Sequence, residues 1–236
     1  SYETRLTKTA QVIKDQIQLD HYLNPPVTGK FQEFGFFLRP PKPLAPAKQF
    51  QLTDLTSGQF LGQYDVDGSF LDLGKNEKGD APKLSLHFLG RRKLAKKADP
   101  KKKTTAPSPA ETAQRGPFVQ DVQGLLGFVF GNAAQGATKD YSKGTNKYKR
   151  QIFPATEKTN IRVYYLAEKA GADTYDAALI WEVPNPPVQA MEKGIDLTLG
   201  SFAAGAKATR AFQGDTPAED APGEGGEAPA GPSAPF

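Results

Sequence analysis

The most strongly charged part of the sequence is a short basic run at residues 91–103. Eight of its residues are positive and one, Asp99, is negative, which gives a net charge of +7. Such a segment attracts phosphate polymers, anionic lipid head groups and acidic proteins, with an affinity that falls as salt rises. The candidate contact residues are the basic side chains of the run, Arg91, Arg92, Lys93, Lys96, Lys97, Lys101, Lys102 and Lys103.

The basic run is open to two interpretations, of which the first is the binding segment just described. No aromatic residue lies between Phe88 and Phe118, so the run lacks both a stacking platform for bases and an apolar face for membrane insertion. The alternative is a solvated loop that the chain's own acidic C-terminal segment, residues 213–236, partly neutralises. That segment holds five acids and no Lys or Arg, and the rest of the chain is nearly neutral.

Other residue types that perform chemistry are sparse. The chain has no Cys and two His, which excludes disulfides, cysteine nucleophiles and a three-His zinc site. His21 and His87 are candidate general bases, but neither lies in a nucleophile motif such as G-x-S-x-G or S-x-x-K. We therefore predict no catalytic residue, metal site or cofactor, and no small-molecule substrate is evident.

Two further motifs imitate binding loops without completing them. Asp65, Asp67 and Asp72 surround a glycine but lack the ligand spacing of a calcium loop, and a hairpin turn explains them better. Residues 131–138 have the glycine spacing of a phosphate loop, with Ala137 where the lysine is required. A glycine loop that follows a helix is the simpler interpretation.

Three segments have the apolar spacing of a helix. At residues 2–23, a single stripe runs through Leu6, Ala10, Ile13 and Ile17. Residues 118–130 are predicted to pack on a sheet, with Gly124 and Gly127 allowing a close backbone approach. At residues 188–207 the stripe is the most regular in the chain, and we expect it to face the sheet; it consists of Val188, Met191, Ile195, Leu199, Phe202 and Ala206.

The predicted strands alternate with turn signals. They lie at residues 31–38, 83–89, 160–166 and 177–183, and a hairpin at 59–73 is predicted to turn at Asp67-Gly68. In the strand at 83–89, Leu84, Leu86 and Phe88 share one face. The polar, glycine-rich segment 131–149 is predicted to be a loop.

These elements predict an α+β fold in which a mainly antiparallel sheet packs between helices. We expect one domain at residues 1–212, interrupted by a flexible basic insertion at 91–117. Residues 213–236, rich in Pro, Gly, Ala and acid, are predicted to form a disordered acidic tail.

The last predicted strand, Ala178 to Pro184, leads into a helix with Ile195, Leu199, Ser201 and Phe202. With the aromatic segment 34–36 running on to Pro40, this resembles the PsbP/DcrB-like superfamily, which includes photosystem II extrinsic protein P and bacterial lipoproteins. The resemblance covers residues 31–40 and 160–207. It implies an antiparallel sheet between helices; the superfamily is mostly non-enzymatic, and the resemblance names no partner.

The sequence thus favours a non-enzymatic, extracytoplasmic module, exported or lipoprotein-like, that binds a protein partner or has a structural role. Because the chain begins at Ser1, we expect a removed N-terminal segment, such as a signal peptide or lipoprotein leader. The alternative is an intracellular polyanion or nucleic-acid binder that acts through residues 91–103. Membrane-surface contact through the same loop also stays open.

Overall fold

The computed structural model describes residues 2–42, 44–46, 53–55, 58–66, 84–93, 117–134, 136–171 and 173–214. The elements of the described residues follow in chain order: α1 (Tyr2–Tyr22), α2 (Lys30–Phe34), β1 (Phe36–Phe37), β2 (Leu44–Pro46), β3 (Thr53–Leu55), β4 (Gly58–Val66), β5 (Ser85–Lys93), α4 (Phe118–Phe130), the 3-10 turn η2 (Gly131–Ala134), β6 (Lys139–Lys143), β7 (Asn146–Thr156), β8 (Thr159–Ala170), β9 (Asp173–Pro184), α5 (Gln189–Ser201), β10 (Ala203–Ala204) and α6 (Ala206–Phe212).

The main sheet is antiparallel, and its strands follow the order β2-β4-β5-β9-β8-β7-β6, with β3 also paired to β4. Tight turns join neighbouring strands where glycines take a positive φ, as Gly144 does between β6 and β7. Such a φ is readily available to glycine alone, so these turns are encoded locally. The α+β prediction is therefore confirmed.

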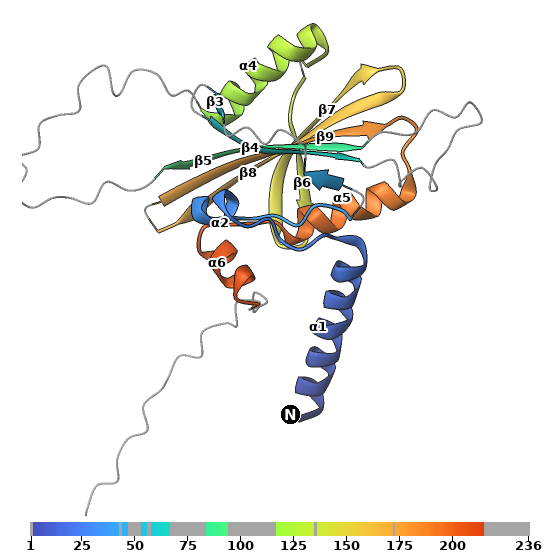
Figure 1. Cartoon of the computed structure of the whole chain (residues 1–236), viewed down its shortest axis with the longest axis vertical. Coiled ribbons are helices and arrows are strands. Elements are labelled where there is room, and N and C mark those ends of the chain that lie inside the picture. Colours follow the sequence, from blue (N-terminus) through green and yellow to red (C-terminus); the bar gives the residue numbers. More distant parts are fainter. Residues whose placement is uncertain are drawn as a thin grey trace, which may run out of the picture.

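Helices cover both faces of the sheet (Figure 1), because side chains alternate along each strand. On one face, Leu84, Leu86 and Phe88 pack with α2, α5 and the β1–β10 pair around the buried Trp181. On the other face, Leu89 packs with α4 in a second apolar core. The predicted sheet between helices, and the shared face of Leu84, Leu86 and Phe88, are as the sequence indicates.

The strand predicted at residues 31–38 is wrong over its first half. Residues 30–34 form α2, which ends at Gly35 with a φ of 83°, and the strand that follows, β1, is two residues long. Phe31 is fully buried in the core next to Phe88, with ring centroids 5.1 Å apart. One helical turn places its ring inward as effectively as a strand would, which is why the aromatic pattern was ambiguous.

The single helix predicted at residues 188–207 is divided in the structure. α5 ends at Ser201, and Phe202 takes an extended conformation that feeds β10, which pairs with β1. Gly205 then begins α6 with a φ of 62°, and a Cβ there would lie 3.0 Å from the Cβ of Ala170. Met191, Ile195, Leu199 and Phe202 are buried as predicted and Val188 is partly buried, whereas Ala206, which lies beyond the break, is exposed.

The loop predicted at residues 131–149 contains a hairpin. Of the described residues, 131–134 form η2 and 136–138 have no regular structure, and then β6 and the first part of β7 pair around Gly144. The sequence looked like a loop because β6 lies at the edge of the sheet and is largely exposed, so it carries polar side chains.

The predicted insertion begins later than the sequence indicated. β5 continues to Lys93 and pairs with β9 over its whole length, so residues 91–93 belong to the sheet. The rest of the predicted insertion up to residue 116, the acidic tail from residue 215, and the second half of the hairpin at 59–73 lie outside the described residues.

Candidate functional site

Helix α1 is anchored to the body at its C-terminal end. Arg39 donates a 2.8 Å hydrogen bond to the carboxylate of Asp20 and another, of 2.9 Å, to the backbone oxygen of Asn24. The hydrogen bond from Arg39 holds the pKa of Asp20 below its usual value. Leu23 is buried and bridges to Pro41, so the helix leaves the body from a fixed point.

Beyond this anchor, no residue of α1 is buried. The helix extends away from the sheet and the other helices (Figure 1). Its apolar stripe, Leu6, Ala10, Ile13 and Ile17, is open to solvent, with exposed fractions of 52% for Leu6, 54% for Ile13 and 65% for Ile17. Exposed apolar patches are a common feature of interaction surfaces, so this stripe is a candidate binding surface.

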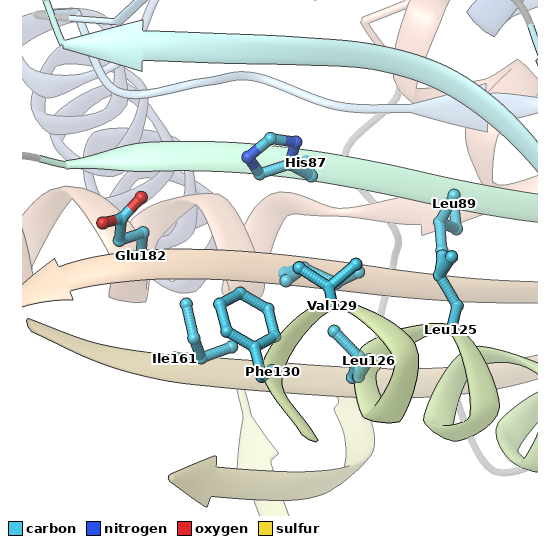
Figure 2. Close-up of a pocket in the computed structure, with 9 residues that line it drawn as sticks. His87, Leu89, Leu125, Leu126, Val129, Phe130, Ile161 and Glu182 are labelled. Atoms are coloured by element: carbon cyan, nitrogen blue, oxygen red, sulfur yellow. The ribbon is translucent and has the colours of Figure 1, made fainter. Parts of the chain in front are cut away.

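A pocket lies between α4 and the sheet, with a volume of about 220 Å³. Its floor comes from Leu89, Ile161 and Ile180 on three adjacent strands. Its roof is the C-terminal half of α4, from which Leu125, Leu126, Val129 and Phe130 contribute (Figure 2).

Two polar side chains, His87 and Glu182, line this pocket. His87 on β5 and Glu182 on β9 lie on the same face, because the register pairs His87 with Ile180 and Ser85 with Glu182. The hydroxyl of Ser85 lies 3.4 Å from a carboxylate oxygen of Glu182 and donates to it. Of the residues that line the pocket, none is a Ser, Cys or Thr nucleophile, so His87 has no nucleophile there to activate.

The roof helix is fixed at its other end. Arg91 forms 3.3 Å ion pairs with Asp121 on α4 and with Asp176 on β9, and its guanidinium lies 5.0 Å from the ring centre of Phe118. Phe118, Val122 and Leu126 form the buried row of α4, whereas Phe128 is 90% exposed. The expected close approach at Gly124 and Gly127 is wrong, since a Cβ at either position would meet nothing within 4 Å.

A second cavity, of about 390 Å³, lies at the base of α1 between α5, α6 and the β6–β7 turn. Several of its polar side chains have partners within the protein. Lys143 pairs with Asp196, Arg39 pairs with Asp20, and the amide of Asn146 donates to the backbone oxygens of Leu199 and Phe202. These groups hold the body together.

The basic residues predicted to contact a polyanion are divided by the structure. Arg91 is held by its two ion pairs, and Arg92 lies over the ring of Tyr175 at 5.4 Å and donates to the backbone oxygen of Glu33. The backbone of Lys93 is the last of β5. Lys96, Lys97, Lys101, Lys102 and Lys103 lie outside the described residues.

The other sequence candidates have structural roles. His21 ends α1 with its ring against Tyr22. Gly131, the first residue of the loop that resembles a phosphate loop, caps α4, and its N–H donates to the backbone oxygen of Gly127. In the described part of the chain, no cluster of three or more His, Asp or Glu side chains forms a metal site.

No protein-family model matches the chain, and a search of curated proteins finds no similar sequence. No helix in the described ranges is both long and apolar enough to cross a membrane. The pocket under α4 was not predicted from the sequence. Its only signal was that helix 118–130 is apolar on more than one face, with Phe128, Val129 and Phe130 in succession.

Proposed function

We propose that the protein is a non-enzymatic module that binds a protein partner through the apolar stripe of α1. The observation that supports the proposal is that one end of this helix is fixed to the body while its apolar stripe is exposed. Its C-terminal end is fixed by Arg39 and Leu23, while Leu6, Ile13 and Ile17 stand open to solvent. A fixed helix with one free apolar face suits docking into a groove or against a second helix.

The helix also needs a partner for its own stability. In proteins, packing of an apolar face supplies most of the stability of a helix, and the apolar face of α1 is exposed. α1 contains six β-branched residues, which lower helix propensity: Thr4, Thr7, Thr9, Val12, Ile13 and Ile17. The side-chain pairs along it, such as Gln11 with Asp15, are exposed and each contributes only a few tenths of a kcal/mol.

The composition of α1 favours a protein partner over a membrane surface. An interfacial membrane helix has a basic polar face and large apolar residues, often Trp or Phe, on the other. α1 has three acidic and three basic residues and neither Trp nor Phe. Its stripe is narrow and aliphatic, with the spacing of a helix–helix seam.

The proposal includes an extracytoplasmic location, exported or lipoprotein-like, and the resemblance to the PsbP/DcrB-like superfamily supports it. In that superfamily, members bind different partners through different surfaces, and an added N-terminal helix would be one such surface. Fractionation of cells that express the full gene tests the location, and recovery of the protein in the cytoplasm would contradict it.

The alternative function, polyanion binding through residues 91–103, has less support. Arg91 and Arg92 already bind groups of the same chain, which leaves fewer free charges than the sequence suggested.

A triple variant with Leu6, Ile13 and Ile17 changed to Gln tests the proposed function. In the cells that make the protein, chemical crosslinking of wild type should give a discrete adduct of higher mass, and the triple variant should lose it. The matched control changes Lys8, Gln11 and Asp15 to Ala on other faces of the same helix, and it should keep the adduct. A wild type without any adduct, or a triple variant that retains it, would overturn the proposal.

A further inference from the structure

We propose that the pocket between α4 and the sheet binds a small apolar molecule, of one or two rings, that carries a hydrogen-bond donor at one end. This site is separate from the stripe of α1. It is argued from the volume of the pocket, the chemistry of its lining and the placement of its polar end.

The volume fixes the size of the ligand. An apolar cavity of about 150 Å³ stays dry and takes up benzene, whereas pockets for drug-sized ligands hold about 300–1,000 Å³. At about 220 Å³, the pocket lies between these sizes. It therefore suits a molecule of one or two rings.

The lining fixes the polarity of the ligand. Seven of the nine lining residues are aliphatic or aromatic, and they come from both the floor and the roof. An apolar ligand would gain dispersion contacts with these side chains. Water is a poor occupant, because it needs two to four polar partners and the apolar part of the pocket offers none.

The polar end sets the orientation. Glu182 lies at the end of the pocket away from Leu89 and Leu125, and His87 lies along β5 between that end and Leu89 (Figure 2). A carboxylate has acceptor sites for several donors, so Glu182 can accept from a ligand in addition to the hydroxyl of Ser85. A ligand with an amine or hydroxyl group should therefore point that group toward Glu182.

The roof provides a route of entry. Arg91 fixes the N-terminal half of α4, while the C-terminal half carries Gly124 and Gly127, which lower helix stability. Val129, at the rim of the pocket, is 61% exposed. The contacts of Arg91 with Asp121 and Phe118 lie at the other end of the helix, so an outward movement of this end would leave them intact.

The test uses two probes of similar shape, 1-naphthylamine with a donor and 1-methylnaphthalene without one. Binding to the intact protein is measured by ligand-observed NMR and by the fluorescence of the amine. We expect saturable binding of both probes, with the amine at least three-fold tighter. Glu182→Leu, which removes the acceptor, should remove most of that preference.

Variants locate the binding site. Leu125→Trp fills the pocket from the roof and Ile161→Phe fills it from the floor, and each should weaken binding ten-fold or more. Phe128→Trp, on the exposed face of the same helix, should leave binding within two-fold of wild type. Circular dichroism verifies folding, and two filling variants are made so that one misfolded variant does not prevent the test.

Absence of saturable binding at millimolar probe would overturn the proposal, as would filling variants that bind like wild type. Equal binding of the two probes would overturn the assignment of a donor to the polar end.

Discussion

At the scale of single residues, Arg91 shows how the structure changes the meaning of a sequence feature. In the sequence it begins a run of positive charge, yet in the structure it joins α4 to β9 through Asp121 and Asp176. Its side chain is 13% exposed, so its pairs are screened less than surface pairs are. The same charge that suggested a binding loop thus stabilises the fold.

We predict that Arg91→Ala lowers the free energy of unfolding by about 2 kcal/mol, because it leaves two partly buried carboxylates without their cation. Urea denaturation measures this. Arg5→Ala, at an exposed position of α1, is the control and should change stability by less than about 0.5 kcal/mol. If Arg91→Ala leaves the free energy of unfolding unchanged but weakens the affinity for heparin, Arg91 contacts polyanions, as the sequence predicted, and does not stabilise the fold.

The attachment of α1 should depend on pH through Asp20. Arg39 lowers the pKa of Asp20 in the folded protein, so this carboxylate stabilises the fold above its unfolded pKa of about 3.9. That contribution is lost as the pH falls through the lowered folded pKa. The side-chain carboxyl of Asp20, followed by NMR, should titrate below 3.9, and Arg39→Gln should raise the midpoint. Identical midpoints in the two proteins would refute the contact.

At the scale of elements, the end of α5 depends on Phe202. Its ring is buried, 5.8 Å from the ring of Phe88 and 6.2 Å from that of Phe36. We expect Phe202→Ala to cost about 3–5 kcal/mol, since it removes a whole aromatic ring from the core. Phe128→Ala, which truncates an exposed ring, should cost less than about 0.5 kcal/mol. A denaturation midpoint that Phe202→Ala leaves unchanged would contradict the packing.

The glycines of α4 and of the α6 boundary should respond to alanine in opposite directions. At Gly124 a methyl group meets nothing, so Gly124→Ala should stabilise the protein by about 0.5–1 kcal/mol. At Gly205 the φ is positive and a methyl group would approach Ala170 and Tyr175, so Gly205→Ala should destabilise it. Thermal melts of both variants test this pair. If both variants raise the melting temperature, or both lower it, the surroundings described for one of the two glycines are wrong.

The sequence predicts an element well when the residues of that element alone determine it, and poorly when a distant segment determines it. The helix at 118–130 and the strands at 160–166 and 177–183 were found because their apolar periodicity is local. The β6–β7 hairpin was missed because an edge strand needs few apolar residues. The break at Phe202 was missed because its apolar spacing continues through Ala206, while the cause of the break, pairing of β10 with β1, lies in a distant segment.

Of the two candidate sites, the sequence showed the stripe of α1 but not the pocket under α4. The stripe of α1 was evident from the sequence, but its exposure was not, because a stripe usually faces the core of its own domain. The pocket joins residues from β5, α4, β8 and β9, which the strand register and the packing of α4 on the sheet bring together. No local pattern could have predicted it.

At the scale of the whole molecule, the described residues form a two-faced α+β body that holds one helix away from itself. The body buries Trp181, Phe31 and Phe88 on one face of its sheet, and α4 closes the other face over the pocket. α1 is joined to this body only at its C-terminal end (Figure 1). This arrangement leaves the stripe as the surface that a partner would cover.

The most direct measurement of this claim is a photo-crosslinking scan along α1 in cells that make the protein. A photoreactive amino acid is placed at each position from 5 to 18, and the adduct yield is measured at each. We predict a helical period, with the highest yields at Leu6, Ala10, Ile13 and Ile17 and low yields at Lys8, Gln11 and Asp15. A uniform yield along α1, or no adduct at any stripe position, would contradict a partner on the stripe.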